Sequence, residues 1–332
     1  MRKKILIITD NLPEQINGVV TTYTNIEAHA ILDGYNFVVL HPGWFSYIDC
    51  PGYNEVKIAY PRNLGAKIEE IRPDYIHIAT EGPLGLWARA YLSVADIRHN
   101  TAYHTKFPEG LRKLFGVPEW ITWRFVRWFH KHSGRVLTTT DSMVAELKAH
   151  GFSGEVLPWT RGVDRAIFTP TLREDFPSRY LLCVSRVSKE KNLEAFLELD
   201  YPGYQKIMVG DGPMLEEYKT SYPDVKFVGA KRGQELAKYF AMADVFVFPS
   251  RWETFGLVMI EAMACGTPVA AYPCQGPLDV IDEGVTGCMR EDLAQAVTGA
   301  LLLDRSKVLA GSQRWTWERA WTIFKANLIT AK

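Results

Sequence analysis

One stretch in the second half of the chain decides the fold class: Val245-Phe246-Val247-Phe248-Pro249-Ser250-Arg251-Trp252-Glu253-Thr254-Phe255-Gly256-Leu257-Val258-Met259-Ile260-Glu261-Ala262. It starts with an unbroken apolar run, which is typical of a strand buried on both faces in a parallel sheet covered by helices. Pro249 ends the strand, and a helix is predicted to begin near Phe255 or Gly256. The stretch is therefore a strand–loop–helix unit of an α/β fold.

The same alternation of apolar strands and helix-like stretches extends along the rest of the chain. The predicted strands of the first half are Lys4–Thr9, Tyr35–His41, Tyr75–Ala79, Thr101–His104 and Val136–Thr139. Those of the second half are Tyr180–Ser185, Lys206–Val209, Val225–Val228, Val245–Pro249 and Pro268–Tyr272. Two such series predict an α/β protein with two doubly wound, Rossmann-like domains.

The length of 332 residues suits two hydrophobic cores better than one. We expect an N-terminal domain over residues 1–163, a linker over 164–179 and a C-terminal domain over 180–332. The linker prediction rests on prolines and charged residues without a periodic pattern. The last segment, Trp315–Ile329, has helix-like spacing and could pack on either domain, including back on the first.

Composition narrows the class of protein and its compartment. The formal net charge is +0, so no overall basic field attracts nucleic acid. The five cysteines contain no Cys-x-x-Cys pair and are expected to be reduced core residues. No apolar run approaches the length of about 18 residues that a membrane span requires, and no signal peptide precedes the first strand. We therefore expect a cytoplasmic protein that is soluble or peripheral at the inner face of the membrane.

Two loops that follow predicted strands carry groups suited to a diphosphate. Arg186 and Lys191 lie in Ser185–Asn192, where a strand ends and a helix is expected to open. A planar guanidinium, an ammonium and free backbone N–H groups together suit an anion, although a solvated basic loop would have the same composition. Gly210-Asp211-Gly212 follows the next strand, and its glycines would allow a ring or ribose to approach the backbone.

Glu253 and Glu261 are the carboxylates of the opening stretch. Glu253 is expected in the loop at the helix entrance and Glu261 about two turns into the helix, on nearly the same face. One carboxylate could accept sugar hydroxyls while the other reaches a ribose. The backbone N–H groups of 254–257 could receive phosphate or sugar oxygens. A capping glutamate and a surface glutamate would give the same spacing by chance.

These motifs resemble, in their order, those of the retaining family-4 glycosyltransferases of the GT-B fold, in which two domains face each other across a cleft. The resemblance covers essentially the whole chain. Its motifs are Gln15-Ile16-Asn17-Gly18-Val19-Val20, Arg161-Gly162-Val163-Asp164, Arg186 with Glu190-Lys191-Asn192, Gly210-Asp211-Gly212-Pro213, and Glu253-x7-Glu261 followed by Ala262-Met263-Ala264-Cys265-Gly266-Thr267-Pro268. One departure is Ser185-Arg186, where the family usually has Gly-Arg.

Three further segments are similar to a bacterial subgroup, the GDP-mannose-dependent α-mannosyltransferases. They are Thr80-Glu81-Gly82-Pro83-Leu84-Gly85, Tyr103-His104-Thr105-Lys106-Phe107-Pro108-Glu109 and Gly276-Pro277-Leu278-Asp279-Val280. The resemblance implies a retaining transfer of a hexose from a nucleotide-diphosphate sugar, of the GDP-mannose or UDP-glucose type, to a hydroxyl of a lipid or glycan.

The resemblance also implies a role for individual residues. The implied catalytic residues are His104, Glu253, Arg186 and Lys191. The implied donor-binding residues are Gly18, Gly210, Asp211, Thr254, Phe255, Gly256, Leu257 and Glu261. The chain has no Asp-x-Asp pair, so we expect neither metal nor cofactor, with basic side chains and helix N-termini stabilising the departing diphosphate. Retention in the family is usually explained by same-face attack, so no nucleophile is assigned.

The acceptor side is the least determined part of the sequence. The stretch 106–135 holds seven Lys/Arg and two Glu, interleaved with aromatic residues. It could lie on an anionic membrane, contact DNA phosphates as in a phage-type transferase acting on modified bases, or be a helix pair with a solvated charged face. The residues assigned to this side are Glu81, Tyr103, Lys106, Arg124, Arg127 and Lys131.

Three other classes of protein remain as alternatives. A sugar-nucleotide epimerase shares the fold, but it would need acid–base groups, and the second domain has no histidine. A Rossmann oxidoreductase would carry Gly-x-Gly-x-x-Gly after the first strand, where this chain has Asp10-Asn11-Leu12-Pro13. An inactive sugar-nucleotide-binding protein would not need Arg186, Lys191, Glu253 and Glu261 together.

Overall fold

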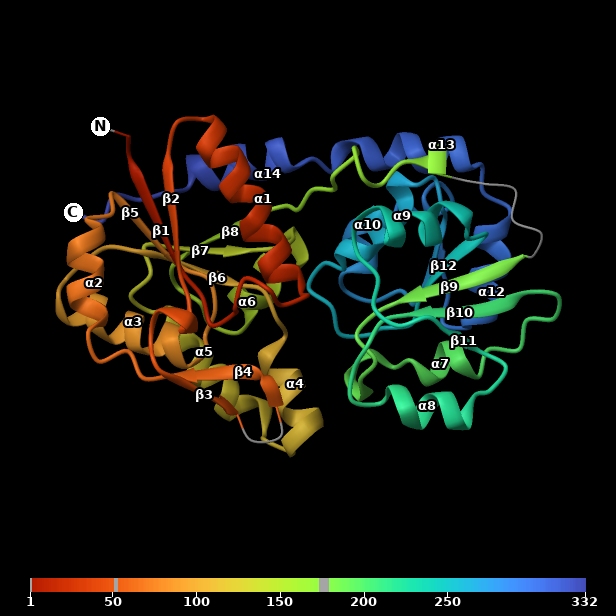
Figure 1. Cartoon of the computed structure of the whole chain (residues 1–332), viewed down its shortest axis with the longest axis horizontal. Helices are drawn as coiled ribbons and strands as arrows, with labels where there is room; N and C mark the ends of the chain where they lie inside the picture. The colour runs from red at the N-terminus through yellow and green to blue at the C-terminus, as the bar shows by residue number, and fades with distance from the viewer. Residues whose placement is uncertain (1, 51–52, 173–178) are drawn as a thin grey trace. The chain divides into compact units, whose positions relative to one another are not determined.

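The computed structural model describes residues 2–50, 53–172 and 179–332. The chain divides into two compact units (Figure 1). Unit 1 comprises Met1–Arg161 and Trp317–Lys332, and unit 2 comprises Gly162–Thr316. The C-terminal segment is therefore part of the same unit as the N-terminal strands.

Unit 1 is built on a six-stranded parallel sheet with the order β2-β1-β5-β6-β7-β8. The strands are β1 (Lys4–Ile8), β2 (Asn36–Leu40), β5 (Tyr75–Ile78), β6 (Asn100–Tyr103), β7 (Arg135–Thr138) and β8 (Glu155–Pro158). A separate antiparallel hairpin pairs β3 (Tyr47–Cys50) with β4 (Tyr53–Ala59).

The helices of unit 1 cover both faces of this sheet. They are α1 (Gly18–Leu32), α2 (Leu64–Ile71), α3 (Pro83–Val94), α4 (Phe107–Phe115), α5 (Glu119–His130), α6 (Asp141–Ala149) and α14 (Trp317–Ala326). Leu6 and Ile8 of β1 pack in one core with residues of α2, α3 and α5. Because side chains alternate along a strand, Ile5 and Ile7 lie on the opposite face. On that face the ring of His77 packs at 5.1 Å from Phe324 of α14.

Helix α14 is held to unit 1 by polar contacts as well as by packing. The Trp321 indole and the Lys325 ammonium both donate to the Asp33 carboxylate, at 3.0 and 2.7 Å. The indole of Trp159 donates to the backbone oxygen of Ala320 at 2.9 Å. Figure 1 shows α14 beside α1, and the two helices are in contact. These contacts explain why the last helix returns to the first unit.

Unit 2 repeats the same strand order, β11-β10-β9-β12-β13-β14, again with parallel pairing. Its strands are β9 (Tyr180–Val184), β10 (Gln205–Val209), β11 (Lys226–Phe227), β12 (Val245–Phe248), β13 (Val269–Ala271) and β14 (Gly287–Met289). Its helices are α7 (Glu194–Leu197), α8 (Leu215–Ser221), α9 (Gly233–Met242), α10 (Leu257–Ala264), α11 (Pro277–Val280), α12 (Leu293–Leu301) and α13 (Arg305–Gly311).

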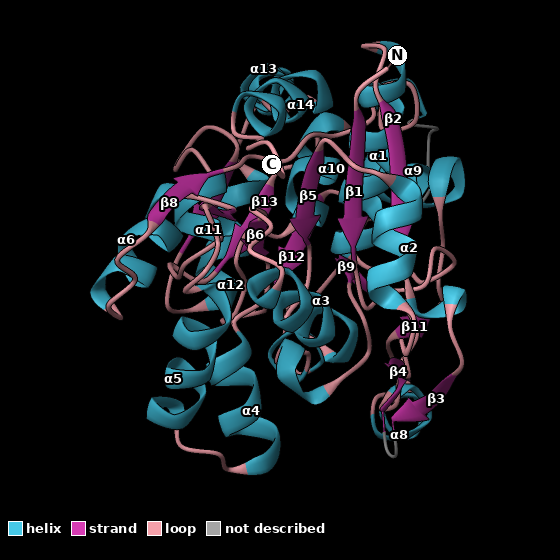
Figure 2. Ribbon diagram, turned by 90° about the vertical axis from the view of Figure 1, so that its left-hand side faces the viewer, coloured by secondary structure: helices cyan, strands magenta, loops and turns pink. Residues whose placement is uncertain are grey.

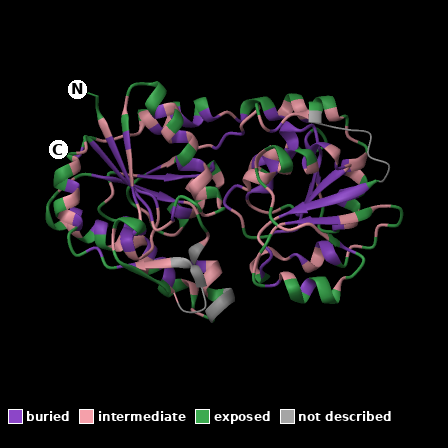
Figure 3. Cartoon of the chain, in the orientation of Figure 1, coloured by how far each residue is buried: buried purple, intermediate pink, exposed green. Residues whose placement is uncertain are grey.

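The sheet of unit 2 is buried between two helix layers, as its apolar strands require. One core joins alternate residues of β9 and β12 to α9 and α10. A second core joins the intervening residues to α7, α8 and α12. The central strands of both units are buried along their length (Figure 3). The predicted fold class, two doubly wound Rossmann-like domains, is thus confirmed for each unit.

The expected linker, 164–179, is described only in part, because 173–178 lie outside the described residues. Its described part contacts the end of unit 2. Arg165 donates to the backbone oxygen of Ser312 at 2.5 Å. Just before the expected linker, the Val163 N–H donates to the Trp315 backbone oxygen at 3.4 Å. Phe168 is buried in the unit 2 core. Arg165 and Phe168 are thus packed within unit 2, although the sequence around them lacks periodicity.

In the part of the chain that the structure describes, no helix combines the length and the apolar character needed to cross a membrane.

Candidate functional site

The strand order defines where a ligand is expected in each unit. In open α/β sheets, ligands bind beyond the carboxyl ends of the strands, at the point where the strand order reverses direction, which is called the switch point. In unit 2 that point lies between β9 and β12, and in unit 1 between β1 and β5. The loops after these four strands carry Arg186 and Lys191, Glu253, Asp10 and Glu81.

In unit 2, the structure joins two of the predicted catalytic residues directly. The ammonium of Lys191 donates to Glu253 Oε1 at 2.6 Å. Beside this pair, the side-chain amide of Asn192 donates to the backbone oxygen of Pro249 at 2.9 Å. The loop after β9 and the loop after β12 are therefore fastened together at the switch point.

The environment of Lys191 keeps its ammonium charged. Burial lowers the pKa of Lys191, but the charge of Glu253 and the hydrogen bond to it, with help from Glu190, raise the pKa above its ordinary value. The Lys191 side chain is 26% exposed, so the charge remains accessible from solvent. A held, charged and accessible ammonium suits an anionic leaving group.

We expected the segment that carries Lys191 to open directly into a helix, but it does not. A single 3₁₀ turn, Lys189–Lys191, follows β9, and Asn192 ends it with a φ of 54°. The short helix α7 begins only at Glu194. Asn is among the few residues that adopt this left-handed conformation readily, so the turn can stop where Lys191 faces Glu253.

Gly210 and Gly212 have a packing reason that the sequence did not reveal. A Cβ on Gly210 would lie 1.8 Å from the backbone oxygen of Ser185, and one on Gly212 would lie 2.4 Å from that of Val187. The Val187 N–H also donates to the Asp211 oxygen at 2.9 Å. These glycines let the β10 loop lie directly on the loop that carries Arg186.

The turn before α10 presents backbone groups rather than side chains. Gly256 is the N-cap of α10 at a φ of 85°, and no side chain caps the helix. A Cβ there would lie 2.7 Å from Met259 Cε, so both conformation and space favour glycine. The ring of Phe255 is buried edge-on against Trp315 at 5.3 Å, which leaves its backbone for any ligand contact.

Glu261 is the fifth residue of α10, little more than one turn into the helix. Our expectation of two turns was wrong, because residues before Gly256 are not helical. Within the described residues, no hydrogen bond to the Glu261 side chain is found, and burial raises its pKa to about 7. A half-buried carboxyl without a partner is able to accept hydroxyl hydrogen bonds from a ligand.

In unit 1, the carboxyl end of β1 is tied to α3 by Asp10. Its carboxylate accepts from the Thr80 hydroxyl and from the Leu84 N–H, both at 2.6 Å. Burial raises the pKa of Asp10 to about 6, although these hydrogen bonds oppose the shift. Asn17 caps α1 by accepting from the N–H groups of Val19 and Val20, which places Gly18 at the exposed start of that helix.

His104, just after β6, is held at both ring nitrogens. The Arg161 guanidinium lies 2.8 Å from Nδ1, and the Tyr23 hydroxyl lies 3.0 Å from Nε2. The same hydroxyl lies 2.8 Å from Nε2 of His77. Burial, reinforced by the Arg161 charge, lowers the pKa of His104 well below its ordinary value, so the ring is neutral near pH 7.

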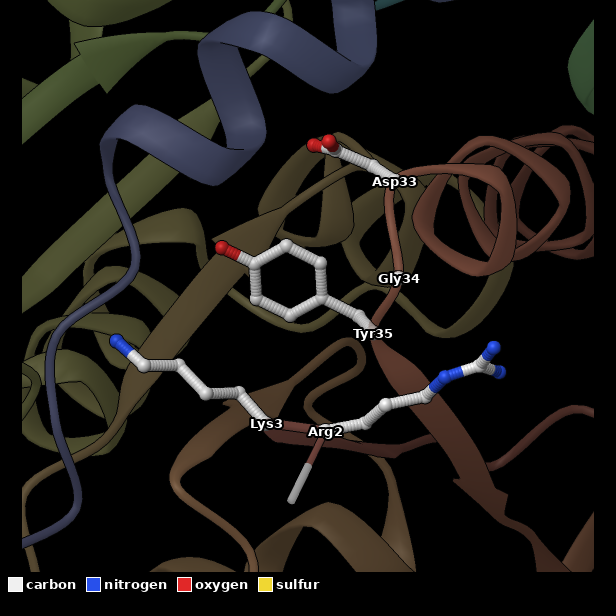
Figure 4. Close-up of a pocket in the computed structure, with 5 residues that line it drawn as sticks. All are labelled: Arg2, Lys3, Asp33, Gly34 and Tyr35. Carbon is white, nitrogen blue, oxygen red and sulfur yellow. The ribbon is translucent and has the colours of Figure 1, made fainter.

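A surface hollow of about 570 Å³ lies elsewhere on unit 1 and is lined by Arg2, Lys3, Asp33, Gly34 and Tyr35 (Figure 4). It lies at the amino ends of β1 and β2, whereas Asp10 and Glu81 lie beyond the carboxyl ends of the strands. Asp33 is bound by α14, and Lys3 donates to the Tyr75 hydroxyl at 3.0 Å. These polar groups already have structural roles.

Comparisons with known proteins agree with this geometry. The profile described as Glycosyltransferase Family 4 matches residues 17–167, and that described as Glycosyl transferases group 1 matches residues 178–303. A GDP-mannose-dependent alpha-mannosyltransferase of Mycolicibacterium smegmatis is 31% identical over 81% of this chain and 75% of its own length. The chain belongs to the family-4 glycosyltransferases.

Two further likenesses extend over nearly the whole of this glycosyltransferase. A GDP-mannose-dependent alpha-mannosyltransferase of Corynebacterium glutamicum is 27% identical over 98% of the chain and 87% of its own length. The solved sucrose-phosphate synthase of Thermosynechococcus elongatus superposes with a TM-score of 0.80 at 19% identity, covering 98% of both chains. That second likeness concerns the fold alone.

Several residues of this glycosyltransferase that we assigned to the acceptor side have structural partners instead. Tyr103 is fully buried, with its ring stacked at 6.2 Å on Trp123, so its side chain does not reach an acceptor or a membrane. Lys106 lies 3.2 Å from Glu146 and 3.7 Å from Glu109, which neutralise it. Glu81 is only 10% exposed, and its carboxylate lies 3.3 Å from His130 Nε2.

Of the basic residues on α5, only part of the predicted set faces solvent. Arg124 is exposed, as is Lys131 at the helix end, whereas Arg127 is half-buried and donates to the His150 backbone oxygen at 2.9 Å. Trp120 and Trp128 are 64% and 46% exposed. The exposed α5 stripe, Trp120, Arg124, Trp128 and Lys131, is therefore both aromatic and basic.

Tyr23, His77 and Asp10 were not predicted as site residues from the sequence, and Arg161 was given no role beyond its motif. Tyr23 and His77 lie inside ordinary helix and strand patterns, where a polar residue in an apolar run is a weak signal. Asp10 directly follows a buried strand, which could have marked it as a residue of the switch point. In the described part of the chain, no group of three or more His, Cys, Asp or Glu residues has the geometry to hold a metal ion.

Proposed function

We propose that this chain is a retaining hexosyltransferase that moves the sugar of a nucleotide-diphosphate sugar to a hydroxyl of a lipid or glycan. The observation that carries the proposal is the Lys191–Glu253 pair at 2.6 Å, at the switch point of unit 2. The loop that carries Arg186 lies against the Gly210–Gly212 loop beside it. Cations next to a carboxylate there suit a diphosphate and the hydroxyls of its sugar.

In this proposal each charged group has one task. Lys191 and Arg186 neutralise the diphosphate as the bond between the anomeric carbon and the phosphate oxygen breaks. Glu253 accepts hydrogen bonds from sugar hydroxyls, and Glu261 accepts those of the ribose. The N–H groups of 254–257, at the start of α10, bind oxygens of the donor.

The acceptor hydroxyl then attacks the same face that the diphosphate leaves. A bond forms between the anomeric carbon and the acceptor oxygen, while the acceptor proton passes to the departing phosphate oxygen. This route needs no enzymatic nucleophile. We also propose that no metal ion is required, because Arg186 and Lys191 supply positive charge where the leaving group develops negative charge.

For the donor we favour GDP-mannose, the donor in the names of the two alpha-mannosyltransferase relatives, with UDP-glucose as the alternative. For the acceptor we favour a lipid, because the exposed α5 stripe carries tryptophan and basic side chains of the kind that suits an anionic bilayer surface. The protein would then act as a peripheral enzyme at the cytoplasmic face of a membrane.

A transfer assay tests this proposal. The protein is incubated in excess EDTA with GDP-mannose or UDP-glucose, and with either anionic phospholipid vesicles or short oligosaccharides as acceptors. We expect release of one nucleoside diphosphate and a glycosylated product whose proton NMR coupling shows the donor's anomeric configuration. An inverted product would contradict retention, metal-reversible loss in EDTA would contradict the metal-free mechanism, and turnover of neither donor would contradict the proposal as a whole.

A further inference from the structure

The hydrogen bonds through Arg161, His104, Tyr23 and His77 have a single consistent direction. A guanidinium carries only donors and stays protonated in proteins, so the contact of 2.8 Å makes His104 Nδ1 the acceptor. A neutral imidazole has one N–H, which must then be at Nε2. Burial, Arg161, His77 and His130 each favour this neutral ring by lowering the pKa of His104.

The direction continues inward from His104. Its Nε2–H donates to the Tyr23 oxygen at 3.0 Å, so the Tyr23 O–H is left to donate to His77 Nε2 at 2.8 Å. The proton of His77 must therefore be at Nδ1. His77 is fully buried, and its Nδ1 has no hydrogen-bond partner among the described residues. Burying an N–H group without a partner costs free energy of folding. With the proton on Nδ1, however, His77 Nε2 can accept from the Tyr23 hydroxyl and end the series of hydrogen bonds.

Packing fixes the same residues in place. The rings of Tyr23 and His104 each lie 5.7 Å from Trp159, and His77 lies 6.1 Å from it. Trp159 is itself fully buried. These hydrogen-bonded side chains thus form a packed polar path from the carboxyl end of β6 into the core between the sheet and α14.

We propose that Tyr23 and His77 are positioning residues that hold His104 in one orientation as its Nε2–H tautomer. The proposal rests on the proposed function, together with the catalytic role that the family resemblance implies for His104. With Nδ1 occupied by Arg161 and Nε2–H directed to Tyr23, His104 does not act as a general base. Both ring nitrogens of His104 are thus engaged within unit 1.

The first test needs no substrate. Long-range proton–nitrogen NMR spectra of uniformly ¹⁵N-labelled enzyme report the protonation of each ring nitrogen, with His104→Gln and His77→Gln spectra for assignment. We expect His104 to carry its proton on Nε2 and His77 on Nδ1, without titration of either between about pH 6 and 8. A proton on His104 Nδ1, or a charged His104 near pH 7, would overturn the proposal even if the enzyme transfers sugar.

The second test separates positioning from stability. Tyr23→Phe removes only the hydroxyl, and we expect kcat to fall at least about tenfold with donor KM within about twofold, because a catalytic group loses its fixed geometry. Tyr91→Phe is the control, since its hydroxyl bonds Glu69 at 3.1 Å on the surface. His77→Gln, which can keep an acceptor for Tyr23, should retain more kcat than His77→Leu. Unchanged kcat in Tyr23→Phe would refute the positioning role.

Discussion

At the residue scale, the donor site depends on charges that hold each other in the free protein. Lys191 is bound to Glu253 at 2.6 Å, and a donor would insert its phosphates and hydroxyls beside this pair. The pair orders both side chains before binding, which lowers the entropy that binding must spend. The same two residues would then act on different parts of the donor.

Replacing Glu253 by glutamine tests this residue directly. We expect kcat/KM for transfer to fall at least about a hundredfold, the scale of losing one transition-state electrostatic contact. The fold should remain, as checked by thermal unfolding. Glu291→Gln is a matched control, because Glu291 also pairs with a cation, Arg251 at 3.2 Å, but on the exposed surface. Near-normal turnover in Glu253→Gln would remove this residue from the site.

The raised pKa of Glu261 predicts that the stability of the protein depends on pH with a definite sign. Because burial raises its pKa from 4.5 to about 7, the native state binds more protons than the unfolded state between those values. Its contribution to the free energy of unfolding therefore falls as pH rises and is most unfavourable above about pH 7. We expect Glu261→Gln to be more stable than the wild type at about pH 8 and equal to it near pH 4, measured by urea unfolding.

The same carboxyl predicts how donor binding responds to pH. The ionised form of Glu261 accepts ribose hydroxyls, so wild-type affinity for the donor should weaken as pH falls through about 7. In Glu261→Gln the affinity should be lower and lose this dependence. Titration calorimetry between about pH 6 and 8 measures both. A wild-type affinity that is flat over this range would separate Glu261 from donor binding.

At the element scale, the position of Arg186 depends on how two loops pack. Gly210→Ala would place a Cβ 1.8 Å from the Ser185 oxygen, so we expect a loss of about 1–3 kcal/mol in the free energy of unfolding and weaker nucleotide binding. Gly203→Ala is the control, since Gly203 has a φ of 84° but nothing within 4 Å of its Cβ position. Equal effects in the two variants would mean that loop packing is unimportant.

The exposed α5 stripe predicts membrane binding. Figure 2 shows α5 beside α4 at one end of unit 1. Near an anionic surface each basic side chain contributes about 1 kcal/mol. Arg124→Glu combined with Lys131→Glu should therefore weaken flotation with anionic vesicles more than about thirtyfold. The double reversal Lys148→Glu with Lys226→Glu, at exposed sites elsewhere, is the control.

Either of two outcomes would contradict the membrane assignment. Wild-type protein that never floats with anionic vesicles would rule out the stripe as a membrane surface. Loss of flotation in both double variants alike would mean that charge in general, rather than α5, is responsible. Binding of single-stranded DNA by the wild type, abolished only by the α5 reversal, would favour the nucleic-acid hypothesis instead.

How well each strand was predicted from the sequence depended on its place in the sheet. Strands with unbroken apolar runs, such as β1 and β12, were predicted to within a residue because burial on both faces leaves a plain signal. The edge strands β8 and β14 were missed, since an edge position tolerates Pro158 and Gly287 and shortens the apolar run. The β3–β4 hairpin lies outside both sheets and has no such run.

Across the whole molecule, the site residues of unit 2 were easier to predict from the sequence than those of unit 1. Charged residues just after strands identified Arg186, Lys191 and Glu253, and two of them are in contact. The hydrogen-bond network around His104 draws on α1, on β5 by way of Tyr23, and on Arg161 at the end of the first segment of unit 1. Only tertiary packing brings these residues together. Their spacing along the chain carries no trace of that proximity.

We propose that the switch point of unit 2 binds a nucleotide diphosphate through Lys191 without a metal ion. Titration calorimetry with GDP and with UDP, in excess EDTA, compares the wild type with Lys191→Ala and with Lys189→Ala, an exposed lysine of the same turn. We predict that one nucleotide binds the wild type and Lys189→Ala alike, and Lys191→Ala at least about tenfold more weakly. Binding of neither nucleotide, or equal binding by all three proteins, would contradict the assignment of Lys191 to a nucleotide-binding site.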